Sequence, residues 1–512
     1  MQGLGEYMLE VLGRIGFGLF GLAVLIGIVW LFSNNRRAVD WKLVATGISL
    51  QIAFAALVLL GGTFLNWLAW LSSTWHSPIL VLGWLYTARW ATVIAICLVA
   101  LMFLADHFGA QATAKRVLRR LTLATATIAA IFVAPYFSQV FDALGHGFVK
   151  ILSFVNAGSS FIFGSLMNTE TYGFIFAFQV LPTIIFFAAL MGVLYHLGVM
   201  QFIVRIMALA ITKVMKVSGA ETTSVCASVF IGQTEAPLTV RPYIPKMTES
   251  ELITMMIGGM AHIAGGVLAA YVGMLGGGDA EQQAFYAKHL LAASIMAAPA
   301  TLVVAKLLIP ETGTPLTRGT VKMEVEKTSS NIIDAAAAGA GDGLRLALNI
   351  GAMLLAFIAL IALLNWPLTW FGEATGLAAA IGKPTDLATI FGYLLAPIAW
   401  VIGVPWQDAT TVASLIGQKV VINEFVAYLQ LADIVNGKVA GVTLSEEGKL
   451  IATYALCGFA NFSSIAIQIG GIGGLAPERR SDLARFGLRA VLGGTIATLM
   501  TATIAGVLSH FG

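Results

Sequence analysis

Long apolar runs separated by short polar connections dominate this chain. A run of about twenty apolar residues is the length that an α-helix needs to cross a bilayer. Such runs lie near residues 15–33, 43–63, 79–106, 120–141, 173–198, 251–274, 289–309, 343–366, 447–470 and 483–510. The pattern predicts an all-α polytopic membrane protein with about ten membrane spans.

Two apolar stretches are interrupted by clusters of polar residues. Gln233, Thr234 and Glu235 place an amide, a hydroxyl and a carboxylate between a glycine and a proline, which both interrupt helices. Asn423 and Glu424 repeat the combination of amide and carboxylate in the second half of the chain. Ionisable residues at membrane depth indicate a functional site, and paired interruptions in two halves are typical of a binding site near the bilayer midplane. We therefore expect two re-entrant helical hairpins that meet at one small polar ligand.

Further polar residues lie inside apolar runs near these interruptions. Asn461 and Ser464 have i and i+3 spacing, which predicts that both lie on one face of a helix. His262 lies in mid-span just before Gly265 and Gly266, a glycine pair that can unwind a helix. A histidine at this place is either a satisfied structural group or part of an ion or proton path, and the sequence leaves both interpretations open.

The distribution of lysine and arginine predicts the topology. These residues gather in alternate connections, so both termini are expected to face out. By the same rule the hairpin around Gln233 enters from the cytoplasm and the hairpin around Glu424 from outside, which is the arrangement of inverted repeats. The predicted organisation is N-terminal spans in 1–63, inserted apolar spans in 64–135, a first repeat in 136–309 with a re-entrant hairpin near 217–247 and a broken helix at 251–274, a cytoplasmic linker in 310–342, and a second repeat in 343–512 with a re-entrant hairpin near 388–435.

Composition narrows the class of function. Of the 512 residues 58% are hydrophobic and 11% are charged, whereas soluble proteins average about 25% charged residues. A net charge of +3 without a basic patch argues against a nucleic-acid partner. The chain contains no phosphate-binding loop of the Gly-x-x-x-x-Gly-Lys-Ser/Thr type, so uphill transport would need an ion gradient rather than ATP. Gly339–Asp342 matches the Gly-x-Gly-Asp pattern of intramembrane aspartyl proteases, but the Tyr-Asp pair that accompanies it is missing, so we do not expect an enzyme.

The polar clusters, once extended to their neighbours, resemble the concentrative nucleoside transporters. The resemblance runs from about residue 11 to 63 and from about 142 to the C-terminus, in the order of that family. The segments that carry it are Gly232–Tyr243, Met247–Leu252, Asn423–Tyr428 and Gly458–Ser464. It implies a nucleoside symporter that works by alternating access in a plasma membrane of the bacterial inner-membrane type. It also implies a homotrimer in the lipid bilayer, each protomer with a moving transport domain on a fixed scaffold.

Position by position, the resemblance implies a substrate site shared by the two hairpins. The residues expected around the nucleobase are Gln233, Thr234, Glu235 and Val267, and those expected around the ribose are Glu424, Phe459, Asn461 and Ser464. Amide and carboxylate acceptors suit a base edge and vicinal hydroxyls, which are costly to bury unpaired. A gated channel or a nutrient-sensing receptor on the same scaffold is the alternative function, and the choice between purines and pyrimidines stays open.

Two departures from the family pattern concern the coupling ion and the insertion. Sodium-coupled members commonly carry Asn and Ser where this chain has Ser228 and His262, and an imidazole is a poor ligand for sodium. Coupling to Na+ or to H+ therefore stays open. The coupling-ion positions implied by the resemblance are Ser228, Ile231, His262 and Ile263. The apolar insertion 64–135 adds two spans to the usual eight.

Overall fold

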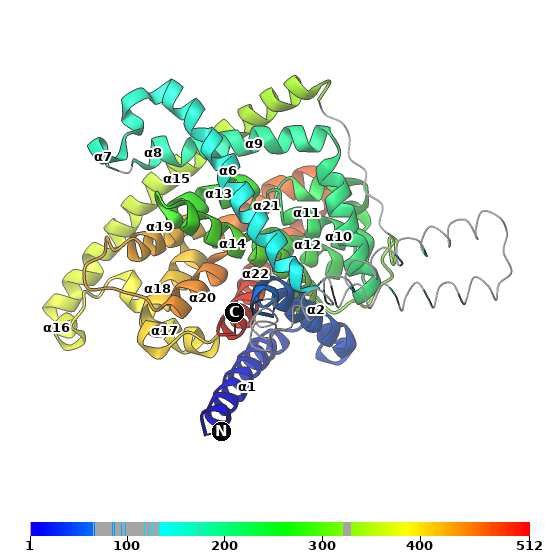
Figure 1. The fold of residues 1–512 in the computed structure, drawn as a ribbon, viewed down its shortest axis with the longest axis horizontal. Helices are drawn as coiled ribbons and strands as arrows, with labels where there is room; N and C mark the ends of the chain where they lie inside the picture. Colours follow the sequence, from blue (N-terminus) through cyan, green and yellow to red (C-terminus); the bar gives the residue numbers. More distant parts are fainter. Residues whose placement is uncertain are drawn as a thin grey trace. The chain divides into compact units, whose positions relative to one another are not determined.

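A computed structural model describes residues 2–64, 134–173, 175–320 and 329–511, together with single positions between 66 and 132. Within these residues the chain is helical (Figure 1), which confirms the predicted all-α membrane fold. Eight helices in the described part are long and apolar enough to cross a membrane, or nine if a pair bent by 116° counts as one span. The predicted inserted spans in 64–135 fall almost entirely outside the described residues.

The contacts divide the chain into two units. One unit contains residues 53–143 with 508–512, where Phe54 packs edge-on against Phe137 and Phe141. The other contains residues 1–52 with 144–507 and includes every predicted site residue. The helices of the N-terminal third are α1 (Gln2–Leu31), α2 (Trp41–Leu59), α6 (Phe137–Phe163), α7 (Thr169–Tyr172) and α8 (Phe176–Gln179).

Two series of helices follow in the same order, one in each half of the larger unit. The first series is α9 (Leu181–His196), α10 (Val199–Met215), α11 (Gly219–Ser228), the 3-10 helix η4 (Ala236–Lys246), α12 (Glu249–Ala261), α13 (Gly265–Gly276) and α14 (Ala280–Leu308). The second is α15 (Ile332–Ala374) with the short α16 (Leu377–Ile381), α17 (Leu387–Val401), α18 (Trp406–Val421), α19 (Glu424–Val435), α20 (Glu446–Leu456), α21 (Phe462–Leu475) and α22 (Arg480–Ser509).

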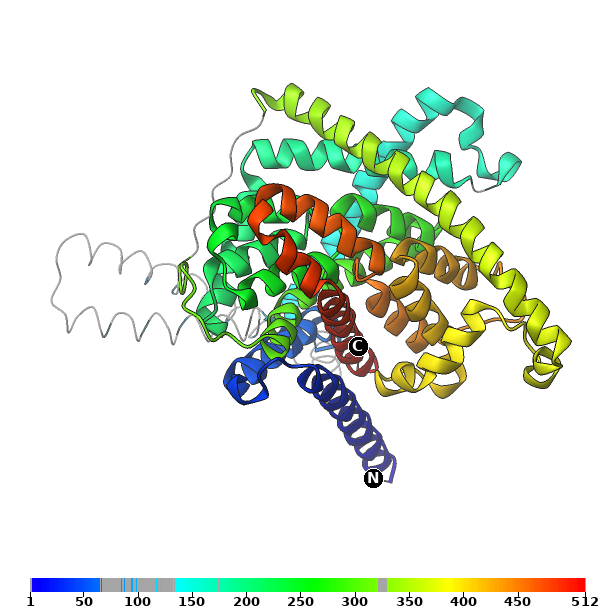
Figure 2. The ribbon, with the colours of Figure 1, turned by 180° about the vertical axis from the view of Figure 1, so that it is seen from behind.

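Small residues let the two halves pack closely. Helices α9 and α15 lie side by side in both views (Figures 1 and 2). A Cβ atom added at Gly339 would lie 2.6 Å from the Ala188 carbonyl oxygen, and one at Gly343 would lie 2.7 Å from the Ala188 Cβ. Because the glycines remove this steric barrier, the backbones approach as they do in other membrane helix pairs.

Each half contains a hairpin whose turn the sequence determines. In the first half α11 ends at Ser228, and two internal prolines keep η4 in short 3-10 turns instead of a regular α-helix. In the second half the backbone leaves the helical conformation at Ile422, and Asn423 then caps α19 by accepting a hydrogen bond from the Val426 amide at 2.9 Å. The polar clusters of the sequence therefore lie at the turns of both hairpins.

Each half also contains a broken helix, and the two breaks cross. In the first half α12 and α13 are separated at residues 262–264, and in the second half α20 and α21 are separated at 457–461. Gly458 has a φ of 157°, and a Cβ there would lie 2.8 Å from the Met260 carbonyl oxygen. The amide of Phe459 donates to the His262 carbonyl at 3.3 Å. The apolar run predicted as a span at 447–470 is therefore two helices and not one continuous helix, because this crossing needs an unwound segment with glycine at its centre.

Two boundaries differ from the sequence-based expectation. The candidate span Phe137–Met167 overlaps the predicted spans only at residues 137–141. It is the least apolar of the eight candidates, because polar residues such as Ser138, Asp142 and His146 lie within it. Helix α15 begins at Ile332, inside the segment predicted as linker. Its first turn is capped by Asn331, whose side chain accepts from the Asp334 amide at 2.9 Å, so polar composition there marks a helix start.

Candidate functional site

Glu424 lies at the centre of the polar residues in the second half. It occupies the first turn of α19, where the positive end of the helix dipole favours a carboxylate, and only 5% of its surface is exposed. The Tyr271 hydroxyl of α13 donates to its Oε1 at 3.3 Å, and the Asn461 Nδ2 donates to its Oε2 at 2.8 Å. The carboxylate therefore connects the second hairpin with both broken helices.

Asn461 precedes α21 and serves as its N-cap. Its Oδ1 accepts from the Ser464 amide at 2.9 Å while its Nδ2 bonds Glu424, so the backbone cap fixes the amide that holds the carboxylate. The sequence predicted Asn461 and Ser464 on one helical face. The two residues are indeed brought together, but Asn461 lies just outside the helix and acts through the cap.

Gln233 brings the first hairpin to the same helix. Its Nε2 donates to the Ser464 Oγ at 3.0 Å, and its Oε1 accepts from the Gln468 Nε2 at 3.1 Å. Gln468 also donates to the Met256 carbonyl at 2.9 Å and is fully buried. Sequence reasoning missed Gln468, although its helical spacing from Asn461 and Ser464 in an apolar run was the available signal. A continuous chain of polar contacts thus links Gln233 to Glu424.

The other predicted substrate residues surround this chain without joining its hydrogen bonds. Thr234 packs against α21, where a Cβ at Gly471 would lie 2.6 Å from its Cγ2. Glu235 is exposed, with its carboxylate against Gly232. Val267 is buried in the first turn of α13, and Phe459 is half-buried in the second break.

Aromatic side chains pack behind Glu424. Tyr271 stacks on Tyr428 with ring centroids 4.1 Å apart, and Phe425 meets Tyr271 edge-on at 4.9 Å. The Tyr428 hydroxyl donates to the Thr453 carbonyl at 2.7 Å. These rings fix the direction of the Tyr271 hydroxyl toward Glu424. No feature of the sequence singled them out, since tyrosine in an apolar run is ordinary.

The predicted coupling-ion residues gather where the first hairpin meets the first break. The Gly265 amide donates to the Phe230 carbonyl at 2.9 Å, which joins the two segments. His262 is buried at the end of α12, with its Nδ1 2.6 Å from the Gly258 carbonyl oxygen. The Ser228 hydroxyl donates to the Ser224 carbonyl at 3.0 Å. Ile231 and Ile263 flank these positions on the two segments, and Ile263 is buried.

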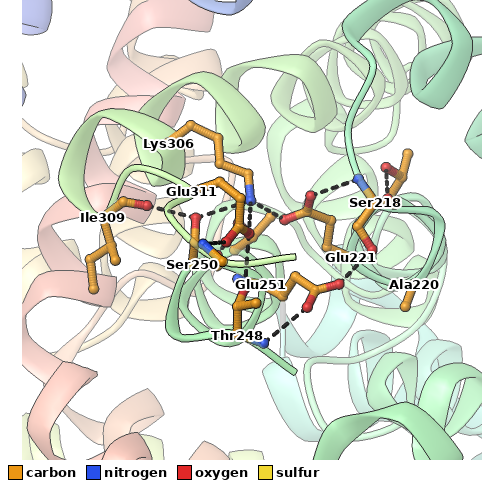
Figure 3. Close-up of polar contacts among 12 residues, drawn as sticks. Ser218, Ala220, Glu221, Thr248, Ser250, Glu251, Lys306, Ile309 and Glu311 are labelled. Carbon is orange, nitrogen blue, oxygen red and sulfur yellow. Dashed lines mark hydrogen bonds and ion pairs between the residues drawn. The ribbon is translucent and has the colours of Figure 1, made fainter. Parts of the chain in front are cut away.

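A buried ionic network holds the base of the first hairpin (Figure 3). The Lys306 Nζ lies 2.7 Å from the Glu221 Oε2 and 3.4 Å from the Glu311 Oε2, and it donates to the Ser250 Oγ at 3.0 Å. The exposed fractions of the Lys306 and Glu221 side chains are 5% and 1%. This network joins the starts of α11 and α12 to the end of α14.

The connection after α14 is part of the same network. The Thr317 Oγ1 accepts from the Ala220 amide at 3.0 Å and lies 2.8 Å from the Ser218 Oγ, while Ser218 donates to Glu251 at 2.5 Å. The start of the first hairpin, the start of α12 and the connection after α14 are thus fixed together.

Comparisons with known proteins agree on one family. Models described as the Na+ dependent nucleoside transporter C-terminus, nucleoside recognition, and the Na+ dependent nucleoside transporter N-terminus match residues 289–506, 177–278 and 20–77. An uncharacterized transporter of Haemophilus influenzae is 43% identical over 423 residues, which cover 81% of this chain and 97% of that protein. The nucleoside permease NupC of Helicobacter pylori is 34% identical, with 96% of this chain and 97% of the permease covered.

Solved structures give the same result. The structure of CNTnw in an inward-facing substrate-bound state has a TM-score of 0.73 and 37% identity, and the match covers 97% of this chain and 98% of that one. A variant of CNTnw in an outward-facing state has a TM-score of 0.75 and 37% identity, with 98% and 100% covered. The chain therefore belongs to the Na+-dependent nucleoside transporter family, whose members are transporters and not enzymes.

Proposed function

We propose that this protein imports nucleosides across the plasma membrane by symport with a cation. The observation that carries the proposal is the chain of contacts from Gln233 through Ser464 and Asn461 to Glu424, which brings the turns of both hairpins onto one broken helix. A nucleoside has a base edge and a ribose with vicinal hydroxyls. Amide groups at one end and a carboxylate at the other match these two parts.

The proposed roles follow from this arrangement. Glu424 accepts hydrogen bonds from the ribose hydroxyls, since Tyr271 and Asn461 already hold its carboxylate in place. Asn461, Ser464 and Phe459 contact the sugar side. The residues proposed around the base are Gln233, Thr234, Glu235 and Val267. Gln233 would exchange its hydrogen bonds to Ser464 and Gln468 for hydrogen bonds to the base, so few buried polar groups would be left without a partner on binding.

Alternating access is the proposed mode of movement. The family resemblance implies a transport domain that moves within a homotrimer, and CNTnw has been solved in inward-facing and outward-facing states. Hydrogen bonds from side chains and from the Gly265 amide join both hairpins to the broken helices. The hairpins and broken helices can therefore move as one body that carries the bound nucleoside.

His262 is the residue through which we propose that a proton could couple to transport, beside the sodium dependence that the family description names. Because the Gly258 carbonyl accepts a hydrogen bond, Nδ1 carries a hydrogen and Nε2 carries a lone pair. Nε2 is buried and forms no hydrogen bond with the described residues, so it is the ring nitrogen that could take up a proton. Coupling to sodium would instead need an oxygen site from the Ser228 hydroxyl and the backbone carbonyls of Ile231 and Ile263.

Uptake into proteoliposomes tests the proposal. Radiolabelled uridine uptake is measured while sodium and proton gradients are imposed separately at matched membrane potential. A symporter accumulates uridine above its external concentration at a rate that saturates. The gradient that drives this accumulation identifies the coupling ion. Uptake that only equilibrates would favour a channel, and saturable binding without flux would favour a receptor.

A further inference from the structure

Lys419 is a fully buried cation in the second half that the proposed substrate site does not use. It lies in the last turn of α18 and has no exposed surface. Its Nζ donates to the Ala455 carbonyl at 2.9 Å and to the Thr498 Oγ1 at 3.0 Å. These acceptors are neutral oxygens, which is unusual for a buried ammonium, because buried charges are normally paired.

The Ala455 carbonyl is available because the helix is broken. In a continuous helix it would accept from the amide of Phe459, but that amide donates to the His262 carbonyl across the crossing of the two breaks. Carbonyls at a helix C-terminus carry a partial negative charge, and C-terminal ends of interrupted helices bind cations in transporters. Lys419 thus places its ammonium where such a helix end would attract a cation.

The first half has an equivalent place. Thr248 and Ser445 cap α12 and α20 in the same way, by accepting a backbone amide with the side-chain oxygen. Gly258 and Ala455 stand at the same distance along the chain from these caps. The Gly258 carbonyl faces the His262 imidazole, whereas the Ala455 carbonyl faces the Lys419 ammonium.

We propose that the Lys419 ammonium is a tethered cation, fixed in the second half at the position equivalent to the coupling-ion site of the first half. A charge that the chain itself supplies needs no ion from solution. Lys419 lies in the last turn of α18 and Glu424 in the first turn of α19, across the turn of the second hairpin, so the ammonium balances the charge of that carboxylate when the site is empty. The inference rests on the proposed function only where it concerns nucleoside affinity.

Two variants separate a tethered charge from a simple hydrogen-bonding contact. Lys419→Gln keeps a donor for the Ala455 carbonyl but removes the charge. Lys419→Ser removes the charge and leaves a space lined by the Ala455 carbonyl, the Thr498 hydroxyl and the new serine oxygen, a set of hard ligands suited to sodium. Wild type and both variants are purified, and uridine affinity and the thermal unfolding midpoint are measured in sodium chloride and in choline chloride at equal ionic strength.

The tethered-cation model makes a distinct prediction for each variant. Lys419→Gln should bind uridine roughly tenfold more weakly than wild type in both salts, the size of effect typical of coupled sites. Lys419→Ser should be equally weak in choline and regain affinity in sodium, and sodium should raise its unfolding midpoint more than it raises that of wild type. The Gln variant is the matched control for loss of charge without space for an ion.

The opposite results would overturn the inference. Wild-type affinity in Lys419→Gln would mean that only the hydrogen bond to Ala455 matters. If sodium changes neither the uridine affinity nor the unfolding midpoint of Lys419→Ser, the position does not accept a cation. If wild type itself binds no nucleoside, the proposed function fails, whereas the sodium dependence of unfolding in the Ser variant still decides the role of Lys419. If the Ser variant cannot be purified, the uridine affinity of the Gln variant decides it.

Discussion

The two buried lysines of the described chain have different surroundings. Lys306 at the end of α14 contacts two carboxylates, Glu221 and Glu311, at the base of the first hairpin. Lys419 at the end of α18 contacts a backbone carbonyl and a hydroxyl beside the turn of the second hairpin. A lysine matched by carboxylates holds segments together, while a lysine among neutral oxygens resembles a bound ion. Burial alone therefore does not reveal the role of a charge; its partners do.

The largest effect is expected at the first lysine. Lys306→Met leaves Glu221 buried without its counter-ion, and breaking a buried pair in this way costs roughly 3–5 kcal/mol of folding stability. We expect a large drop in the yield of folded protein and in its unfolding midpoint, measured by size-exclusion chromatography and thermal unfolding in detergent.

The double variant Lys306→Met with Glu221→Gln is the control for that result. It removes both charges, so much of the lost stability should return. Equal stability of the single and double variants would show that the ion pair does not hold the hairpin base. Lys306 could then no longer be contrasted with Lys419 as a lysine that holds segments together.

The second effect concerns the carboxylate next to Lys419. Glu424→Gln keeps the shape of the side chain but removes the charged acceptor proposed for the ribose. The loss should be about 1.5–3 kcal/mol, more than tenfold in affinity, and uptake should vanish while folding is unchanged. Uridine uptake and unfolding of the same preparation check this.

Competition by free bases gives an independent check on Glu424. Uridine should compete strongly for wild-type uptake and uracil weakly, because uracil lacks the ribose. Equal competition by the two compounds would show that the second hairpin does not recognise the sugar.

A smaller effect is expected at the first hairpin, where neutral groups face the base. Gln233→Ala removes hydrogen bonds worth about 1 kcal/mol each, so the ranking of nucleosides should change while recognition of the sugar persists. Uptake of a panel of nucleosides and of sugar-modified analogues measures this. Gln468→Ala serves as the control, since it loosens Gln233 without removing it. A uniform loss across the whole panel would assign Gln233 to general positioning instead.

The sequence predicted the parts of this site better than their connections. Apolar runs located most spans, and glycine and proline around Gln233 located the first turn. The bond between Gln233 and Gln468 joins residues separated by 235 positions, so only the fold brings them together. The crossing of the breaks at His262 and Phe459 was hidden for the same reason, because each break is local but their contact is tertiary. The charge of Lys419 is evident from the sequence. Its neutral partners, the Ala455 carbonyl and the Thr498 hydroxyl, are far from it in the chain and only the fold brings them to it.

The last prediction concerns the choice of coupling ion in the first half. It should have the smallest effect on total uptake, but it tests most directly the comparison between this site and Lys419 in the second half. Ser228→Asn with His262→Ser restores the oxygen-bearing residues common in sodium-coupled relatives at the position equivalent to Lys419. Transport should then depend more strongly on sodium and lose its response to a proton gradient, with little change in maximal uptake. His262→Ala alone should remove the proton response without creating a sodium response, because it supplies no oxygen. Uptake in proteoliposomes under each gradient measures both variants. An unchanged ion preference in the double variant would show that these two positions do not select the ion, and His262 would then be a structural residue that closes the end of α12 through the Gly258 carbonyl.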